Sequence, residues 1–101
     1  MLTNYFVYIT TNPAKTVFYI GVTNNLERRM SEHRANKGKP ETFAGKYFCY
    51  KLIYFEEFFN ISDAIDREKE LKHFNRIDKI HLVKTVNPDF NLIDVFPNQQ
   101  P

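Results

Sequence analysis

Residues 5–23 read YFVYITTNPAKTVFYIGVT, and this stretch decides the fold. Its two ends, residues 5–10 and 17–23, are rich in aromatic and β-branched residues, which is typical of strands. The connection between them is short and polar, and Pro13 presets a turn there. Two strands joined in this way predict an antiparallel hairpin.

A helix is expected directly after the hairpin. Asn24 is followed three residues later by Glu27, which resembles the capping box at a helix start. We predict a helix from Asn25 to about Asn36, because the sequence KGKP at residues 37–40 ends it. Residues 37–46 are then predicted to form an exposed basic loop.

The rest of the chain predicts one strand and two helices. Residues 47–59 are apolar on both alternating faces, which predicts a strand covered on both sides. Asn60 can cap a helix over residues 61–73, and a last helix is predicted over about 76–86 because Pro88 stops it. The predicted order is β-β-α-β-α-α, an α+β fold in which helices pack on a small antiparallel sheet.

Length and composition predict a single folded domain. The chain has 101 residues, of which 43% are hydrophobic and 26% are charged, as in ordinary soluble proteins. We expect the domain to span residues 1–96 and residues 97–101 to form a disordered tail. No apolar run approaches the ~18 to 20 residues of a membrane helix and no secretory signal is evident, so we expect a cytoplasmic protein with no membrane partner. The single cysteine, Cys49, excludes an intrachain disulfide and a zinc site built from cysteines.

Basic residues are concentrated in residues 27–51. The net charge of the chain is only +2, but this window contains seven Lys or Arg residues against three acidic ones. A basic segment on a nearly neutral chain favours a partner that carries phosphates. The alternative is a solvated helix and loop that keep the chain soluble.

One carboxylate falls where the helix over residues 61–73 should be apolar. With an advance of about 100° per residue, Glu68 lies on the apolar stripe, between Ile65 and Leu71. A carboxylate aimed at a core is costly unless it is paired, hydrogen-bonded or bound to a metal. Two structural alternatives remain open: an ion pair with Lys72 four residues on, or a stripe that points at a sheet edge where Glu68 reaches solvent.

The first predicted helix also turns polar groups toward the sheet. Arg29 and His33 lie close to its inner face, whereas Arg28 and Glu32 are predicted to point outward. The structural alternative for Arg29 is a side chain whose stem covers apolar surface while its head stays wet. His33 has the equally plain alternative of a packed or surface histidine.

Two tyrosines face each other across the predicted hairpin. The turn between Tyr8 and Tyr19 has the right length to bring their strands side by side. Most strand tyrosines only pack and donate one hydrogen bond. Taken together, however, the predictions describe a sheet with two phenols, one adjacent helix that offers a cation, and another that offers a carboxylate.

The same positions form a recognisable pattern. Phe6-Val7-Tyr8 is followed after ten residues by Tyr19-Ile20-Gly21, which resembles the two-part signature of the GIY-YIG endonuclease superfamily. The resemblance covers about residues 4–93 and continues through VTNNLERRMSEH at 22–33, AIDREKELK at 64–72 and NPDFNL at 87–92. It is greatest with small stand-alone members similar to the N-terminal nuclease domain of excinuclease C. One departure is that Phe6 replaces the first glycine of the signature.

The resemblance implies a three-stranded antiparallel sheet and roles for five residues. Arg29, ten residues after Tyr19, matches the family's catalytic arginine, and Glu68 matches its metal-binding glutamate. Glu68 would hold one divalent ion, Mg²⁺ or Mn²⁺, and would meet Arg29 over the two phenols. Tyr8 would act as general base or orient the attacking water with Tyr19 beside it, and His33 would relay the proton.

The implied activity is metal-dependent hydrolysis of phosphodiester bonds in DNA, in repair or recombination, with RNA as an alternative substrate and no obligate protein partner. Lys72 would assist as the partner of Glu68, and Asn87 would orient the glutamate or a water. Contacts with the nucleic acid are expected from exposed cations of the first helix and the basic loop, namely Arg28, Arg34, Lys37, Lys39 and Lys46.

Two other functions compete with a nuclease. Tyr19-Ile20-Gly21-Val22 and Gly45-Lys46-Tyr47-Phe48 faintly resemble the sheet motifs of RNA-recognition domains, which bind without chemistry. Those domains begin with a strand and a helix, whereas a hairpin comes first here. A nuclease-like fold that binds nucleic acid and cleaves poorly remains as the softer form of this alternative. The other is a protein-interaction domain in which Glu68 and Arg29 form a buried ion pair.

Overall fold

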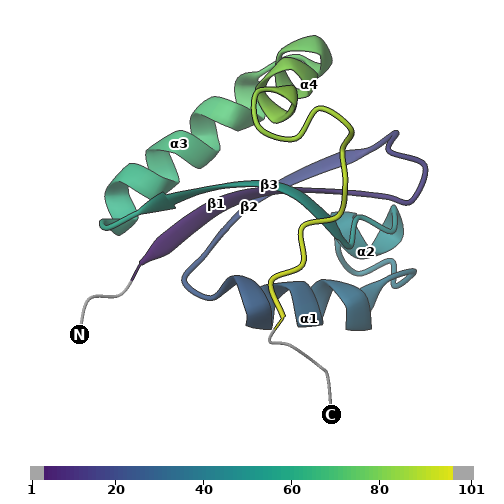
Figure 1. Ribbon diagram of the computed structural model, residues 1–101. Helices are drawn as coiled ribbons and strands as arrows, with labels where there is room; N and C mark the ends of the chain where they lie inside the picture. Colours follow the sequence, from purple (N-terminus) through teal and green to yellow (C-terminus); the bar gives the residue numbers. More distant parts are fainter. Residues whose placement is uncertain (1–3, 97–101) are drawn as a thin grey trace.

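The computed structural model describes residues 4–96, and a three-stranded antiparallel sheet lies at the centre of the fold (Figure 1). The elements in chain order are β1 (Tyr5–Thr11), β2 (Phe18–Thr23), α1 (Leu26–Asn36), α2 (Phe43–Lys46), β3 (Lys51–Phe58), α3 (Ile61–His73) and α4 (Arg76–Lys84). The α+β class and the predicted order are confirmed, with the short helix α2 as an addition. The tail predicted over residues 97–101 lies outside the described residues.

The strand β1 is the middle strand of the sheet. The strand order is β2-β1-β3, and both neighbours run antiparallel to β1. The predicted hairpin is therefore confirmed, and it pairs Tyr8 with Gly21. Every residue of β1 from Val7 to Thr11 is buried, because strands cover both of its edges and helices cover both of its faces.

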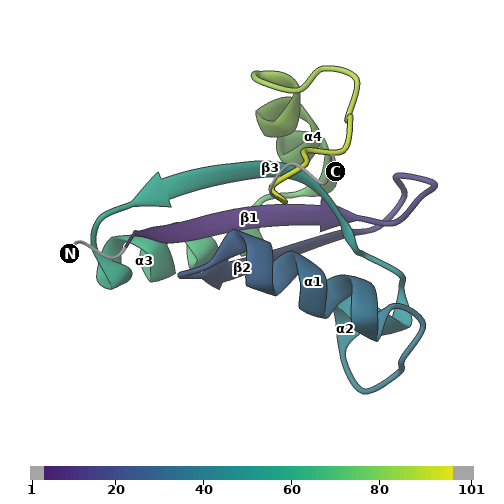
Figure 2. The ribbon, with the colours of Figure 1, turned by 60° about the horizontal axis from the view of Figure 1, so that its bottom comes forward.

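Helices cover both faces of the sheet, as Figures 1 and 2 show. The helices α3 and α4 lie on one face, where they bury Val7 and Ile9 of β1 with Leu71 and Val83. The helices α1 and α2 lie on the other face, where Tyr8 packs with residues of α1 and β3, namely Leu26, Met30 and Leu52. Because successive residues of a strand point to opposite faces, Tyr8 faces α1 while its neighbours face α3.

The strand predicted over residues 47–59 begins later than expected. Residues 43–46 form α2, capped by Thr42, and Phe48 has a positive φ of 59° that breaks an extended chain. β3 therefore starts at Lys51, and residues 37–46 are not a loop throughout. The predicted burial on both faces holds only for residues 52–54.

Helix ends depart from the predictions by one or two residues. Asn25, not Asn24, caps α1, and its side chain accepts a hydrogen bond from the Arg28 backbone N–H at 3.0 Å. Asn60 caps α3 as predicted. α4 ends at Lys84 and not near residue 86. No helix within residues 4–96 is both long enough and apolar enough to cross a membrane.

The loop before α2 packs tightly against Gly45, which generates the first prediction. A Cβ at Gly45 would lie 2.5 Å from the carbonyl oxygen of Lys39 and 2.6 Å from that of Asn36. These are backbone atoms, so Gly45→Ala must move the chain, and we expect it to lower the free energy of unfolding by about 1–3 kcal/mol in urea denaturation. Ala35→Ser, at an exposed position of α1, is the control. Equal unfolding midpoints for Gly45→Ala and the unsubstituted protein would contradict this close packing.

Candidate active site

Tyr8 lies at the centre of the candidate site. Its side chain is fully buried on the middle strand, and its ring extends over Gly21 of β2. A Cβ at position 21 would lie 2.4 Å from the Tyr8 hydroxyl oxygen, so only glycine leaves room for the phenol. The glycine of the second motif is therefore explained by where the tyrosine of the first motif lies.

The Tyr8 hydroxyl is hydrogen-bonded to two side chains of α1. Arg29 donates from Nε to the Tyr8 oxygen at 3.2 Å, and His33 Nε2 lies 2.9 Å from the same oxygen. Arginine can only donate, so the proton of the Tyr8 hydroxyl is free to be donated to His33 Nε2. In the tautomer that carries its proton on Nδ1, His33 accepts this proton, and the network then runs from Arg29 through Tyr8 to His33.

Burial shifts the pKa values of the two titratable groups in opposite directions. It lowers the pKa of His33 to about 4, with help from the charge of Arg29, so the ring is neutral at pH 7 and can accept a hydrogen bond on its unprotonated nitrogen. Burial also raises the pKa of Tyr8 to about 12 and outweighs the lowering effect of Arg29. Arg29 alone therefore leaves Tyr8 a phenol at neutral pH, and a general base here needs a further positive charge.

Tyr19 and Arg29 complete the group around Tyr8. The Tyr19 ring lies 6.3 Å from the Tyr8 ring and 5.5 Å from the His33 ring, measured between centroids. Burial alone lowers the pKa of Arg29, but hydrogen bonds to Glu32 and Tyr8 raise it above its ordinary value. The structure thus bonds the arginine to Tyr8, and the ring of Tyr19 lies next to that phenol.

Glu32 is exposed, as predicted, with 44% of its side chain open to solvent, but its carboxylate also has a partner that the prediction did not name. It accepts a hydrogen bond from Arg29 Nη1 at 2.8 Å, and this bond lowers the pKa of Glu32. The signal was present in the sequence, because residues three apart on a helix are neighbours. Arg28, one turn before Glu32, is more distant at 3.8 Å.

Glu68 approaches the sheet from the other side. α3 and α1 cover opposite faces, and Glu68 lies between the buried residues Ala64 and Leu71 with 18% of its side chain exposed. Lys72 Nζ lies 3.6 Å from its carboxylate, which is the predicted ion pair across one helical turn. Burial, more than any charge, raises the pKa of Tyr8, and the charge of Glu68 adds a smaller raising effect.

The partners of Arg29 and Glu68 exclude one of the predicted alternatives. Arg29 pairs with Glu32, and Glu68 pairs with Lys72, so the two residues do not form the buried ion pair of a protein-interaction domain. Residues 4–96 contain no group of three or more His, Cys, Asp or Glu side chains that could enclose a metal ion. A single, partly exposed carboxylate fits a hydrated Mg²⁺ or Mn²⁺, because such an ion keeps most of its waters.

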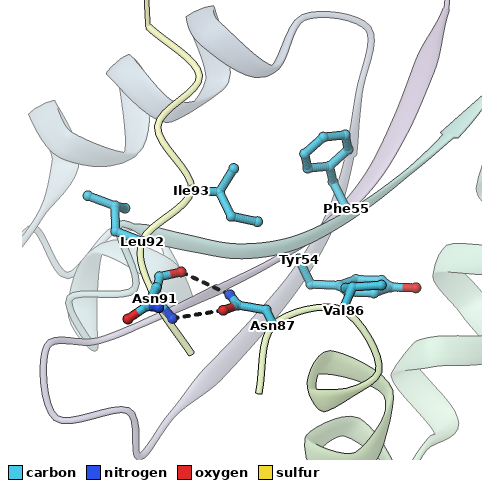
Figure 3. Close-up of a pocket in the computed structure, with 7 residues that line it drawn as sticks. All are labelled: Tyr54, Phe55, Val86, Asn87, Asn91, Leu92 and Ile93. Atoms are coloured by element: carbon cyan, nitrogen blue, oxygen red, sulfur yellow. Dashed lines mark hydrogen bonds between the residues drawn. The ribbon is translucent and has the colours of Figure 1, made fainter. Parts of the chain in front are cut away.

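Asn87 holds the C-terminal segment to β3 (Figure 3). Its side-chain nitrogen donates to the carbonyl oxygens of Ile53 at 2.8 Å and Asn91 at 2.9 Å, and its side-chain oxygen accepts from the Asn91 N–H at 3.0 Å. These bonds occupy the amide, so the predicted role of orienting Glu68 does not match its contacts. An apolar cavity of about 380 Å³ adjoins Asn87.

The five cations predicted to contact nucleic acid are all exposed, namely Arg28, Arg34, Lys37, Lys39 and Lys46. Three of them lie over aromatic rings: the Arg34 guanidinium is 4.2 Å from the centre of Phe96, Lys37 Nζ is 5.1 Å from the centre of Tyr50, and Lys46 Nζ is 5.3 Å from the centre of Tyr47. Exposed cations from α1 and from the segment that follows it are therefore available to phosphates.

Comparison with known families identifies this arrangement. The GIY-YIG catalytic domain matches residues 4–80, which contain the phenols, Arg29, His33 and Glu68. The chain belongs to the GIY-YIG family. A GIY-YIG domain indicates a nuclease-type hydrolase whose substrate is nucleic acid, and nucleases of this family generally use a divalent metal.

Several small relatives have similar sequences. A UPF0213 protein of Limosilactobacillus reuteri is 39% identical over 75 residues, which cover 74% of this chain and 77% of that protein. A UPF0213 protein of Natronomonas pharaonis is 36% identical over 83 residues, covering 82% of this chain and 94% of that protein. The solution structure of a UPF0213 protein from Bacillus halodurans matches with a TM-score of 0.53 and 28% identity, over 86% of this chain and 89% of that one. This GIY-YIG protein is thus similar to small stand-alone members.

The missing first glycine of the GIY-YIG signature has a structural explanation. Phe6 packs its ring against Phe55 of β3, with 5.9 Å between ring centroids in an edge-to-face arrangement. Both residues lie on the α1 face, where Phe6 joins the packing around Tyr8. The larger side chain therefore fills the sheet surface beside Tyr8 and leaves Tyr8 in place.

The buried neutral His33 predicts a pH-dependent stability. The unfolded histidine titrates near pH 6.5 and the folded one near pH 4, so the unfolded state takes up a proton first as the pH falls. The free energy of unfolding should therefore decrease between pH 6.5 and 4, by up to about 1.4 kcal/mol per pH unit. Urea unfolding at several pH values measures this slope.

The matched variants are His33→Gln and His73→Gln. His33→Gln should reduce the slope, whereas His73→Gln, at an exposed position of α3, should leave it unchanged. An unchanged slope in His33→Gln would show that His33 titrates as freely in the folded protein as in the unfolded one.

Proposed function

We propose that this protein is a metal-dependent endonuclease that hydrolyses phosphodiester bonds in DNA, with a role in DNA repair or recombination. The observation that supports it most strongly is the hydrogen-bonded group of Arg29, Tyr8 and His33, on positions that match the family motif. Each member has a defined donor or acceptor role, and phosphodiester hydrolysis needs those roles: a cation for the phosphate, an orienting group for the water and an acceptor for a proton.

Arg29 is the group that binds the scissile phosphate. It lines a polar cavity of about 440 Å³ beside β2, together with Arg28 and Glu32. A guanidinium can donate two parallel hydrogen bonds to phosphate oxygens. Its Nη1 is paired with Glu32 in the protein alone, so the phosphate takes the place of the Glu32 carboxylate on Arg29.

Tyr8 and His33 move the proton of the attacking water. The Tyr8 oxygen accepts a proton from the water as the Tyr8 proton passes to Nε2 of the neutral His33, so one O–H bond breaks at each oxygen as a new bond to hydrogen forms. The excess proton then lies on the imidazole at a cost in free energy, because burial and the charge of Arg29 lower the pKa of His33 to about 4. The charge of Arg29 favours negative charge on the Tyr8 oxygen and opposes positive charge on His33.

Glu68 holds the divalent ion, Mg²⁺ or Mn²⁺, and Lys72 keeps the carboxylate in place through their ion pair. When bound, the ion supplies positive charge to the phosphate and to the leaving oxygen. In this scheme Tyr19 packs beside the phenol and the imidazole and restricts their positions. Asn87 acts at a distance, by fixing the C-terminal segment to β3.

The first test is the cleavage rate of two variants on a supercoiled plasmid with Mg²⁺ or Mn²⁺. Arg29→Lys keeps the charge but loses the Nε–H bond to Tyr8, and Glu68→Gln removes the metal-binding charge. Each should lower the nicking rate by roughly 10²- to 10³-fold, the usual loss for a preorganised charge-stabilising group. Asp66→Asn, an exposed position of α3, is the control and should cleave normally. A nicking rate equal to that of the unsubstituted protein in Arg29→Lys or Glu68→Gln would contradict the role proposed for that residue.

The raised pKa of Tyr8 favours one alternative, a nucleic-acid-binding module with little catalysis. A panel of nicked, branched, single-stranded and RNA substrates distinguishes the two functions. Metal-dependent product from any of them supports the endonuclease, whereas binding to all with no product supports the module.

A second test measures the salt dependence of DNA binding in EDTA. Affinity should fall steeply as salt rises, because each neutralised phosphate releases counterions. Lys39→Gln should reduce the slope of log K against log salt by about one. Lys84→Gln, at an exposed position of α4, is the control and should not change the slope. A slope that is flat in the unsubstituted protein would exclude the basic segment as the DNA surface.

A further inference from the structure

A row of aromatic rings leads from the candidate site to the surface. Tyr19 lies beside Tyr8, Phe43 stacks on Tyr19 with 6.3 Å between centroids and 26° between planes, and Tyr47 follows 4.8 Å from Phe43. The row starts at a fully buried ring, whereas Phe43 is 50% exposed and Tyr47 is 41% exposed. Two rings of α2 and its C-cap are therefore open to solvent next to the catalytic group.

This exposure is not a consequence of a disordered loop. Thr42 caps α2 by accepting a hydrogen bond from the Gly45 N–H at 3.0 Å, and the Cys49 N–H donates to the Ala44 carbonyl at 2.8 Å. Both ends of the short helix are thus tied down. The two rings are held on a fixed backbone, so little conformational entropy is lost when they bind a flat partner.

The charge around the rings favours an anionic partner. Residues 34–51 contain five cations and a single carboxylate, Glu41. Lys46 Nζ lies 5.3 Å from the centre of the Tyr47 ring, and Lys37 Nζ lies 5.1 Å from the centre of the Tyr50 ring. Aromatic rings for stacking with cations for a backbone are the combination that binds single-stranded nucleic acid.

We propose that Phe43 and Tyr47 form a platform on which an unpaired base stacks, so that the substrate is a DNA with a single-stranded segment next to the cleaved bond. The proposal rests on the proposed function for the identity of the substrate. The bases of an intact duplex are stacked on each other and their faces are not accessible. A base next to Tyr19 would lie beside the residues that act on the phosphate, which gives the platform a positioning role in cleavage.

Binding in EDTA tests the platform without any cleavage. The full chain is titrated with a fluorescently labelled oligo-dT and with a blunt duplex of the same length. Phe43→Leu and Tyr47→Leu keep apolar volume but lose the π-face, and each should bind oligo-dT roughly 5- to 100-fold more weakly with little change for duplex. Phe59→Leu is the matched control: Phe59 is 77% exposed and follows the far end of β3. Thermal unfolding shows that each variant is folded.

A spectroscopic measurement detects stacking directly. The chain contains no tryptophan, so Tyr47→Trp introduces a single tryptophan at the platform, whose emission can be excited apart from the tyrosines. Oligo-dT should quench its emission, and the blunt duplex should not. This readout does not depend on whether Leu substitutions perturb α2.

The outcomes separate the platform from the nuclease. Unchanged oligo-dT affinity in both Leu variants, or an unquenched tryptophan, overturns the platform even if plasmid nicking persists. If Glu68→Gln abolishes nicking while oligo-dT still quenches the tryptophan emission, the platform is supported independently of the nuclease activity. Sedimentation of the unsubstituted protein provides a last check: a dimer that Phe43→Leu dissociates would show that a second copy covers the rings, and the platform would be overturned.

Discussion

The hydroxyl of Tyr8 is the interaction on which the rest of the site depends. It lies on the middle strand, crosses β2 above a glycine and is hydrogen-bonded to two residues of α1. A buried phenol without hydrogen-bond partners would lower the stability of the fold. These bonds therefore stabilise the folded protein as well as serving the proposed reaction. They also fix α1 against the sheet at the turn of the helix that carries Arg29. The position of α1 on the sheet therefore depends on the glycine in β2, because any side chain at position 21 would displace the Tyr8 phenol that forms both bonds.

A second polar contact performs the same task on the opposite face. Arg67 of α3 binds Glu56 of β3 with two hydrogen bonds of 2.9 Å, from Nε and Nη2, and the Tyr54 hydroxyl donates to the same carboxylate. Bidentate pairs of this kind restrict rotation as well as distance. Arg67 directly precedes Glu68, so this contact fixes the rotation of α3 about its axis and thereby the direction of the Glu68 carboxylate. The two helices that carry the proposed catalytic groups are thus each fixed to the sheet by polar bonds to a strand.

Local pattern was sufficient to predict the elements of the fold, but not their contacts. The alternating aromatic and β-branched residues of 5–23 determine a hairpin almost unaided, and Asn60 caps its helix as its position predicts. The start of β3 was predicted too early because the aromatic residues after residue 46 favour a strand. The positive φ of Phe48 belongs to a turn, and the periodicity of hydrophobic residues does not indicate such a turn. The contacts of Asn87 depend on which neighbours tertiary packing brings near, whereas the pair of Arg29 and Glu32 is local to α1. Motif spacing placed Arg29, Tyr8 and His33 correctly because they lie on one helix and one strand.

The ion pair between Arg29 and Glu32 has a consequence for how the proposed site meets its substrate. A guanidinium on a flexible stem loses conformational freedom when it binds phosphate, which weakens binding. Here the stem is already fixed, because Nε is bonded to Tyr8 and Nη1 to Glu32. When a phosphate replaces the exposed Glu32 carboxylate, the bond to buried Tyr8 remains and keeps the guanidinium oriented. The arginine therefore exchanges one anion for another without losing further conformational freedom. Its charge stays next to the Tyr8 oxygen throughout, where it lowers the pKa of Tyr8 against the raising effect of burial.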